Sequence, residues 1–429
     1  MGIQGEKMKP LITGMVMMAI AGAATGQTLD DLKRDGNGGS TDNVLTFGMG
    51  YYQQRYSPLK QINKSTVKKL VPVWSASLDN NLGEQAQPMV YNGVLFVPTV
   101  KDTFAIDIAT GRQLWRTPVD YAPDTPRVVC CGLINKGLVL YNGKVIRGTL
   151  DAHVVALDQK TGKEVWKQKA AEWKDGYSMT NAPQIANGVV ITGMAGGEYT
   201  TRGFLNGWDP ETGKHLWRTY TVPAPGEKGS ETWPKDDAWK TGGAPTWRSG
   251  AYDPELDLIY WGTGNPAPWT PQSRNGLDGL YASTLLAIRP KTGQIVWHYQ
   301  YTPNDVWDVD GTDEPVLADI NFEGKPRKVL FQANKSGFMY TIDRTNGQLL
   351  AAHPFTRVNW ASRIDLKTGR PVINEELYSR IVKGEEVQIY PQRGVNAVPV
   401  AYNPTKNLIY TSSWNIPRIF KVDLPIPQQ

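Results

Sequence analysis

The chain has 429 residues, of which 40% are hydrophobic and 20% are charged, and it carries a formal net charge of +5. This composition supports a sizeable hydrophobic core and excludes a disordered or fibrous chain. The lysines and arginines form no basic block, so the sequence gives no sign of a nucleic-acid-binding surface.

The N-terminus predicts a signal peptide over residues 1–26. Two lysines precede an apolar run over residues 11–24, and small residues follow it. A membrane anchor is the alternative, but the run is short for a span of about 20 residues, and no other segment is as long and apolar. We therefore expect the chain from residue 27 onward to lie in the bacterial periplasm, with no membrane span after cleavage.

Five segments further along the chain resemble one another. They are AIDIATGRQLW (105–115), ALDQKTGKEVW (156–166), GWDPETGKHLW (207–217), AIRPKTGQIVW (287–297) and TIDRTNGQLLA (341–351). In the first three, Trp115, Trp166 and Trp217 recur at an interval of about 50 residues, which is typical of propeller blades.

Each repeat is interpreted as a β-hairpin. The Asp side chain can accept hydrogen bonds from the turn backbone, and the Gly supplies a residue with positive φ. The flanking apolar residues alternate as in half-buried strands, and the Trp is placed to pack against a neighbouring blade. The repeats therefore predict an all-β propeller with about six blades, interrupted by long excursions at 221–246 and 353–395.

Four motifs carry a resemblance to a known family. They are TDNVLTFGMGYYQQRYSPLKQINKSTVKKL (41–70), the adjacent pair Cys130-Cys131, WGTGNPAPW (261–269) and WDVDGT (307–312). From about residue 41 to its end, the chain resembles the PQQ-dependent methanol and alcohol dehydrogenases, including their lanthanide-type branch. The resemblance implies an eight-bladed quinoprotein β-propeller around PQQ and a metal ion. We expect residues 27–429 to form an incomplete propeller domain, truncated at the C-terminal end that would close the ring.

The resemblance assigns several residues to PQQ. Cys130 and Cys131 are expected to form a vicinal disulfide against one face of the cofactor, since the periplasm permits disulfides, and Trp247 matches the residue that stacks on the other face. Lys136 stands where the family commonly has an Arg that clamps a PQQ carboxylate. The remaining matches to cofactor contacts are Thr180, Ala195, Gly196, Gly197, Lys335 and Asn396.

Other positions depart from the family pattern. Ala195 replaces a common Ser, which removes one hydroxyl contact, and Ala397 replaces the usual Trp after Asn396. A family Glu falls on Gln85, which we do not assign to the site.

The same motifs imply a metal site. Glu198, Asn265 and Asp308 match the family's ligands, and their oxygens suit calcium-like cations. Asp310 adds a third carboxylate, and alternate residues of an extended strand share a face. Lanthanide-type members of the family carry an Asp at this position, where calcium-type members usually carry a small residue. The resemblance therefore implies a lanthanide, with calcium as the alternative, and Coulomb attraction, which scales with the product of the charges, supports this choice. A plain turn role for Asp310 before Gly311 also stays open.

The family mechanism assigns catalytic roles to Asp308 and Lys335. Asp308 is the expected general base for the alcohol hydroxyl, and Lys335 is the expected cation that stabilises the developing oxyanion. The metal acts as a Lewis acid. The prediction is a periplasmic oxidoreductase that converts a primary alcohol to the aldehyde and passes electrons to a soluble cytochrome c. The sequence has no Cys-x-x-Cys-His haem motif, and homodimer formation stays open.

Two alternatives remain. The chain could be a truncated, inactive dehydrogenase fragment, because an open propeller leaves sheet edges unpaired. It could also be a non-catalytic propeller scaffold of the outer-membrane assembly type, which shares such repeats. A scaffold needs neither the cysteine pair nor the Glu, Asn and Asp ligands, so these features favour the enzyme.

Overall fold

The computed structural model describes residues 27–35 and 42–422. The expected signal peptide lies outside these residues. Within these described residues the two α-helices are short, α1 (Leu29–Asp35) and α2 (Glu375–Val382). In the part of the chain that the structure describes, no helix has the length and apolar character needed to span a bilayer.

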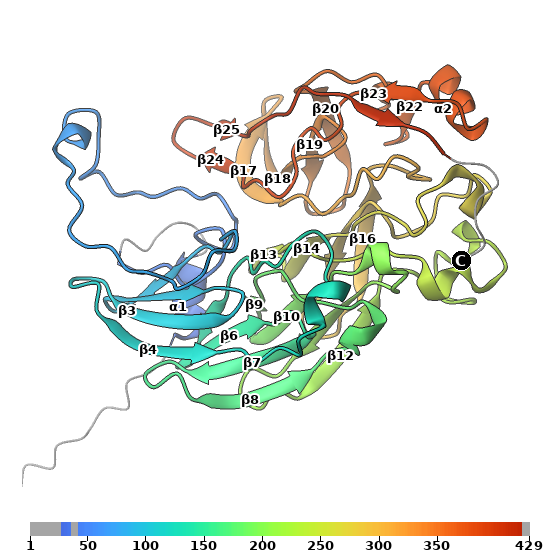
Figure 1. Ribbon diagram of the computed structural model, residues 1–429. Helices are drawn as coiled ribbons and strands as arrows, with labels where there is room; N and C mark the ends of the chain where they lie inside the picture. The colour runs from blue at the N-terminus through green and yellow to red at the C-terminus, as the bar shows by residue number, and fades with distance from the viewer. Residues whose placement is uncertain (1–26, 36–41, 423–429) are drawn as a thin grey trace, which may run out of the picture.

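Five four-stranded antiparallel sheets follow one another along the chain, each formed by consecutive strands. Their strands are β1 (Met89–Tyr91), β2 (Val94–Pro98), β3 (Asp102–Asp107) and β4 (Gln113–Pro118); β5 (Val139–Tyr141), β6 (Lys144–Gly148), β7 (His153–Asp158) and β8 (Glu164–Lys169); β9 (Gln184–Ala186), β10 (Val189–Gly193), β11 (Phe204–Trp208) and β12 (His215–Tyr220); β13 (Ala251–Asp253), β14 (Leu258–Gly262), β15 (Thr284–Ile288) and β16 (Ile295–Gln300); β17 (Val316–Phe322), β18 (Lys325–Ala333), β19 (Phe338–Asp343) and β20 (Leu349–Pro354). The sheets stand in an arc around a common centre (Figure 1), so the fold is the predicted β-propeller.

The remaining strands form two-stranded sheets, and the count of about six blades therefore stays a prediction. These pairs are β21 (Ala361–Ile364) with β22 (Pro371–Ile373), β23 (Val387–Ile389) with β26 (Arg418–Phe420), and β24 (Ala401–Asn403) with β25 (Leu408–Tyr410). The β21–β22 hairpin lies within the expected excursion at 353–395 but repeats the turn chemistry of the blades. There Asp365 Oδ1 accepts a hydrogen bond from Thr368 N, and Gly369 has φ 72°.

The repeat turns are built as the sequence predicts. In the first blade, Asp107 Oδ1 accepts hydrogen bonds from the backbone N of Thr110 (2.9 Å) and from its hydroxyl (2.7 Å). Gly111 then adopts φ 72°, a conformation that costs glycine little. The second and third blades repeat this arrangement at Asp158 and Asp209. The predicted hairpins are confirmed.

The repeat tryptophans join each blade to the next. Trp115 Nε1 donates to the carbonyl of Gln159 (3.0 Å), and its ring lies against Gly162, where an added Cβ would come within 2.6 Å of the indole. Trp166 and Trp217 make the equivalent bonds to Pro210 O (3.1 Å) and Pro290 O (2.9 Å). The predicted docking of Trp on the neighbouring blade is confirmed.

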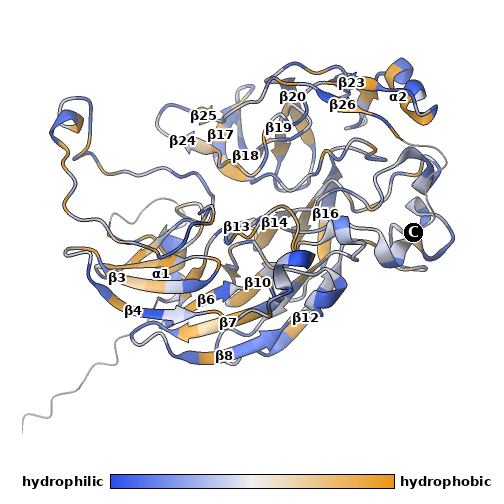
Figure 2. Ribbon diagram, viewed as in Figure 1, coloured by the Kyte–Doolittle hydropathy of each residue, from blue (hydrophilic) through white to orange (hydrophobic). Residues whose placement is uncertain are grey.

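The core lies within and between the blades. All five residues of β6, of β10 and of β14 are buried, whereas β4, β8 and β12 at the outer edges are largely exposed. Figure 2 shows the matching change from hydrophobic inner strands to hydrophilic stretches on the outer strands. The inner strands are therefore held by packing on both sides, which gives the loops at their ends a rigid base.

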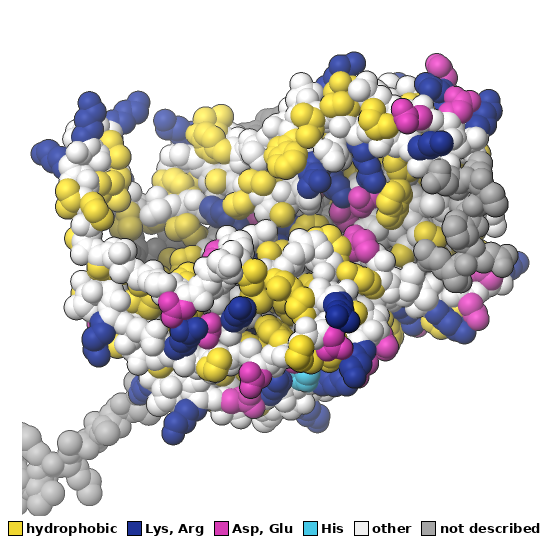
Figure 3. Space-filling view, in the orientation of Figure 1, with side chains coloured by type: hydrophobic (Ala, Val, Ile, Leu, Met, Phe, Trp, Pro, Cys, Tyr) yellow, Lys and Arg dark blue, Asp and Glu magenta, His cyan; other side chains and the backbone are white. Residues whose placement is uncertain are grey.

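An arm formed by residues 56–74 projects from the body of the propeller (Figure 1). Its exposed apolar side chains are Leu59, Ile62, Val67, Leu70, Val71 and Val73. Lysines lie among them, and Figure 3 shows both kinds of side chain on the projection. The arm contributes no side chain to the cavity described next.

Candidate active site

The strand order brings many of the predicted residues to one end of the blades. In an antiparallel blade the first strand begins beside the point where the second strand ends. The segments entering β5, β9 and β13 carry Lys136, Thr180 and Trp247, respectively. The segments leaving β10 and β18 carry Glu198 and Lys335. These loops surround a cavity of about 520 Å³.

Hydrogen bonds link the loops of successive blades around this cavity. Lys136 O accepts from Gln87 N (3.2 Å), and Lys136 N donates to Thr180 O (2.9 Å). The Thr180 hydroxyl in turn donates to Trp247 O (3.3 Å). Each loop is therefore positioned by its neighbour as well as by its own strands.

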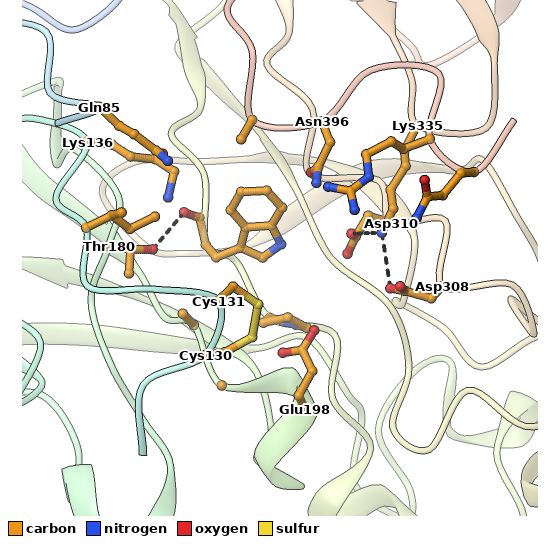
Figure 4. Close-up of a pocket in the computed structure, with 18 of the residues that line it drawn as sticks. Gln85, Cys130, Cys131, Lys136, Thr180, Glu198, Asp308, Asp310, Lys335 and Asn396 are labelled. Carbon is orange, nitrogen blue, oxygen red and sulfur yellow. Dashed lines mark hydrogen bonds and ion pairs between the residues drawn. A yellow bond between two sulfur atoms is a disulfide. The ribbon is translucent and has the colours of Figure 1, made fainter. Parts of the chain in front are cut away.

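Most of the predicted site residues line the cavity. They are Cys130, Cys131, Lys136, Thr180, Ala195, Gly196, Glu198, Trp247, Asp308, Asp310, Lys335 and Asn396. Gly197 and Asn265 lie behind this wall: Gly197 packs on Pro245, and Asn265 Oδ1 lies 3.7 Å from the point where a Gly197 Cβ would be. Figure 4 shows Lys136 and Thr180 at one end of the cavity and Asp308, Asp310 and Lys335 at the other.

The cysteine pair forms a vicinal disulfide, which confirms the prediction. The pair follows the short 3-10 helix η2 (Thr125–Val128), and both sulfurs belong to the cavity wall. A Glu198 carboxylate oxygen lies within 4.8 Å of the two sulfur atoms. Since the sulfurs are bonded to each other, they are not thiolate ligands, which leaves the Glu198 carboxylate as the group on this side of the cavity that could bind a cation.

Asp308, Asp310 and Lys335 form an ion cluster at the other side. The Lys335 ammonium donates to Asp308 Oδ1 (3.1 Å) and to Asp310 Oδ2 (2.9 Å), as the dashed lines in Figure 4 show. Burial opposes the charge on Lys335, but the two carboxylates outweigh it and raise the pKa of the ammonium. The cluster therefore holds a permanently charged cation between two carboxylates.

Two carboxyl groups of the site, those of Asp308 and Glu198, have raised pKa values. Burial raises the pKa of Asp308 to about 6, although the positive charge of Lys335 opposes this rise. Glu198 opens onto the cavity, yet partial burial and then the charge of Asp310 raise its pKa as well. The negative charge of Asp310 therefore adds to the effect of burial on both pKa values, and perturbed carboxyl groups of this kind are common at functional sites.

The loop that carries the aspartates differs from the extended segment that we expected. Asp308 and Asp310 have φ values of 58° and 62°, in the left-handed region, so the backbone at these two residues is not extended. The buried carboxylate of Asp305 stabilises this loop, because it accepts hydrogen bonds from Trp307 N (2.9 Å) and Val309 N (2.9 Å). Asp305 was not identified from the sequence.

Asp310 is also held from the side of Asn265. Its Oδ1 accepts a hydrogen bond from the backbone N of Asn265 (2.9 Å), so the Asn265 side chain takes no part in this bond. Gly264 makes the approach feasible, because an added Cβ there would lie 2.7 Å from Asp310 Oδ1. A glycine before Asn265 therefore lets the loop containing Asp310 pack closely.

Arg418 is a further cavity residue that the sequence did not indicate. It extends from β26, and its Nη1 contacts Asp308 Oδ2 (3.3 Å) and Trp307 O (3.2 Å). Its guanidinium carbon lies 4.9 Å from the Trp269 ring centroid. Asp308 is thus flanked by two cations, Lys335 and Arg418. Arg393 and Gln392 also line this end of the cavity.

Comparisons with known proteins agree with this geometry. A family model described as the PQQ glucose/ethanol/alcohol dehydrogenase β-propeller domain matches residues 46–359. The chain is 42% identical to quinohemoprotein alcohol dehydrogenase ADH IIB of Pseudomonas putida, over 96% of this chain and 62% of that protein. It is 40% identical to quinoprotein alcohol dehydrogenase PedH of Pseudomonas putida, over 92% of this chain and 70% of that protein.

A solved structure gives the same result. A europium-containing methanol dehydrogenase superposes with a TM-score of 0.85 at 34% sequence identity, covering 90% of this chain and 70% of that chain. The chain thus spans about 62% to 70% of the length of these relatives.

Proposed function

The chain belongs to the PQQ glucose/ethanol/alcohol dehydrogenase β-propeller family, and on this basis we propose that it oxidises a primary alcohol to the aldehyde with PQQ and a metal ion. One observation carries the proposal. A single cavity is lined by the vicinal disulfide on one side and by the cluster of Asp308, Asp310 and Lys335 on another.

The cavity residues fit PQQ, a flat aromatic cofactor with carboxylate groups. Trp247 and the Cys130–Cys131 disulfide offer broad apolar surfaces for its ring. Lys136 has a buried Nζ with no hydrogen-bond partner among the described residues, which suits an incoming carboxylate. The Thr180 hydroxyl lies at the same end of the cavity. Further cofactor contacts are assigned to Ala195, Gly196, Gly197, Lys335 and Asn396.

The oxygen atoms of Glu198, Asn265, Asp308 and Asp310 fit a hard cation, because carboxylate and amide oxygens are the ligands that such ions prefer. We assign the metal to these four residues. The third carboxylate, that of Asp310, favours a trivalent lanthanide over calcium, since the attraction grows with the charge of the ion. The likeness to a europium-containing methanol dehydrogenase supports this choice.

When bound, PQQ and the metal supply the electrophilic group that accepts a hydride. Asp308 takes the hydroxyl proton of the alcohol, for which its carboxylate is ionised at and above neutral pH. Lys335 fixes that carboxylate through its hydrogen bond to Asp308 Oδ1 and offers positive charge to the oxyanion that develops. Arg418 restrains the second oxygen of Asp308.

We place the protein in the periplasm, with residues 1–26 as a signal peptide, residues 27–429 as the propeller domain, and a soluble cytochrome c as the electron acceptor. The basis is the sequence of the N-terminus and the membership of the PQQ-dependent alcohol dehydrogenase family. The membership of the PQQ family and the cysteine pair favour an enzyme over a propeller scaffold.

The test is reconstitution of the purified protein with PQQ and either Ca²⁺ or La³⁺. We expect PQQ to remain bound after gel filtration, as measured by its absorbance, and alcohol-dependent reduction of an artificial electron acceptor. Binding of PQQ without turnover of any alcohol would favour the inactive-fragment alternative. Failure to bind PQQ with either metal would refute the cofactor assignment.

A further inference from the structure

We propose that Lys136 is a neutral amine in the empty cavity and takes up one proton from solvent when a ligand carboxylate binds beside it, so that loading of the site is coupled to protonation. The inference deepens the proposed function and rests on it, because the ligand is the anionic cofactor PQQ. It concerns the binding step alone and requires no turnover.

The position of the Lys136 side chain is the first support. Its backbone is held by the hydrogen bonds to Gln87 and Thr180, and the residue is only 4% exposed. The Nζ atom is buried without a hydrogen-bond partner among the described residues, and it lies 5.1 Å from the Trp247 ring centroid. The residue also lines the cavity, at the end that holds Thr180 (Figure 4), so a ligand that fills this end would lie beside it.

The neighbouring charges are the second support. Arg248 shares the Trp247 ring, with its guanidinium carbon 5.8 Å from the centroid, and it is buried as well. The facing anion is Glu314, but its carboxylate already pairs with Arg248 (2.7 Å) and with Arg55 (2.6 Å). Asp313, the other acidic residue here, also lies against Arg248 (3.5 Å). The nearby carboxylates are therefore committed to arginines.

These surroundings disfavour the ammonium form of Lys136. Burial removes its hydration, the positive charge of Arg248 repels it, and the attraction of Glu314 compensates only in part, so the pKa falls to about 7. Above that pH the empty site holds a neutral amine. A ligand carboxylate would restore an opposite charge at contact distance and favour the ammonium again.

The coupling makes the affinity for the ligand depend on pH. Above pH 7, binding of each PQQ requires Lys136 to take up a proton from solvent, so the association constant should fall about tenfold per pH unit until the pKa of Lys136 in the occupied site is reached. Below pH 7 the amine is already protonated, and the affinity should level off. Arginine at this position would keep its charge throughout and show no such slope.

The experiment is a calorimetric titration of PQQ into the protein, at constant Ca²⁺, in buffers of different ionisation enthalpy. We expect the uptake to be small at pH 6 and to rise toward one proton per PQQ above pH 7. Since PQQ carboxylates are ionised over this range, the ligand itself contributes no proton. In Lys136→Arg this uptake should be absent, while PQQ still binds.

Lys174 provides the matched control, because its Nζ also lies over an indole ring, 5.7 Å from the Trp173 centroid, but at an exposed position. Lys174→Arg should leave the uptake unchanged. Binding of PQQ by the wild-type protein with no uptake at pH 8, or with equal uptake in Lys136→Arg, would overturn the proposal and leave the proposed function standing. No binding at any pH would overturn both. If Lys136→Arg does not fold, the pH slope of the wild-type affinity decides alone.

Discussion

The two ends of the cavity treat charge in opposite ways. At the paired end, Asp308, Asp310, Lys335 and Arg418 neutralise one another within the protein. At the unpaired end, the Lys136 Nζ is buried and has no hydrogen-bond partner among the described residues. Both ends lie on loops that join buried strands of the blades, so the difference reflects which side chains stand there and not a difference in the fold.

The comparison teaches where a ligand contributes binding energy. A paired group has little to gain from an incoming ion of opposite charge, and its removal should alter the chemistry at the site. An unpaired buried group carries a desolvation cost that a ligand can offset, so its removal should alter affinity and pH dependence. Substitutions at the paired end should therefore affect rate more than they affect retention of PQQ.

The largest effect is expected for Asp308→Asn. The amide cannot accept the hydroxyl proton, so kcat should fall about 10²- to 10⁴-fold, while the dissociation constant of PQQ changes far less. Steady-state kinetics and fluorescence titration of PQQ measure the two quantities. Asp237→Asn, at an exposed surface ion pair, is the control. A loss of PQQ binding equal to the loss of rate would abolish the contrast between the ends.

Lys335→Met should have the second-largest effect. We expect kcat to fall about 10²- to 10³-fold, because one electrostatic stabiliser of the oxyanion is removed. The variant also leaves Asp308 and Asp310 without their shared cation, so the metal should bind more tightly. Lys335→Arg keeps the charge and should recover part of the rate. Unchanged metal affinity in Lys335→Met, measured by calorimetry, would show that the ammonium does not neutralise these carboxylates.

Asp310→Ala should change the choice of metal. Removal of the third carboxylate should weaken La³⁺ about tenfold more than it weakens Ca²⁺, since the attraction to the trivalent ion is stronger. Activity measured as a function of each metal concentration tests this outcome. Equal loss with both ions, or no loss with either, would leave the lanthanide assignment without support.

Arg418→Met should have the smallest effect. The guanidinium is about one-quarter exposed and its contact with Asp308 is 3.3 Å long, so solvent screens much of the interaction. We expect kcat to fall about two- to fivefold with little change in the KM for the alcohol. A loss as large as that of Lys335→Met would mean that Arg418 contacts the substrate.

The local parts of the fold could be read from the sequence. A turn with Asp, Thr and Gly, followed by a Trp four residues after the Gly, is a short-range signal, and the blades of Trp115 and Trp166 formed as expected. The hairpin at Asp365 was missed because it has no terminal Trp and lies in a stretch interpreted as an excursion.

The site could be predicted only where a motif carried it. The loops before and after the inner strands hold the assigned residues, and the resemblance located them. Arg418 was missed because it lies 110 residues from Asp308 in sequence, and only the pairing of β23 with β26 brings it near. The left-handed backbone conformations of Asp308 and Asp310 lie in a loop that the buried Asp305 stabilises. No pattern in the sequence of this loop distinguishes Asp305 from an ordinary surface aspartate.

Because each repeat tryptophan packs on the blade that follows it in the chain, a blade gains this contact only after the following blade has been synthesised. The carbonyl that accepts the hydrogen bond from the Trp115 indole lies 44 residues later in the chain, and the acceptor for Trp217 lies 73 residues later. At roughly 5–20 residues per second, these intervals last about 2–9 s and about 4–15 s. A blade therefore lacks the contact between its Trp and the next blade until that next blade has been synthesised and has folded beside it.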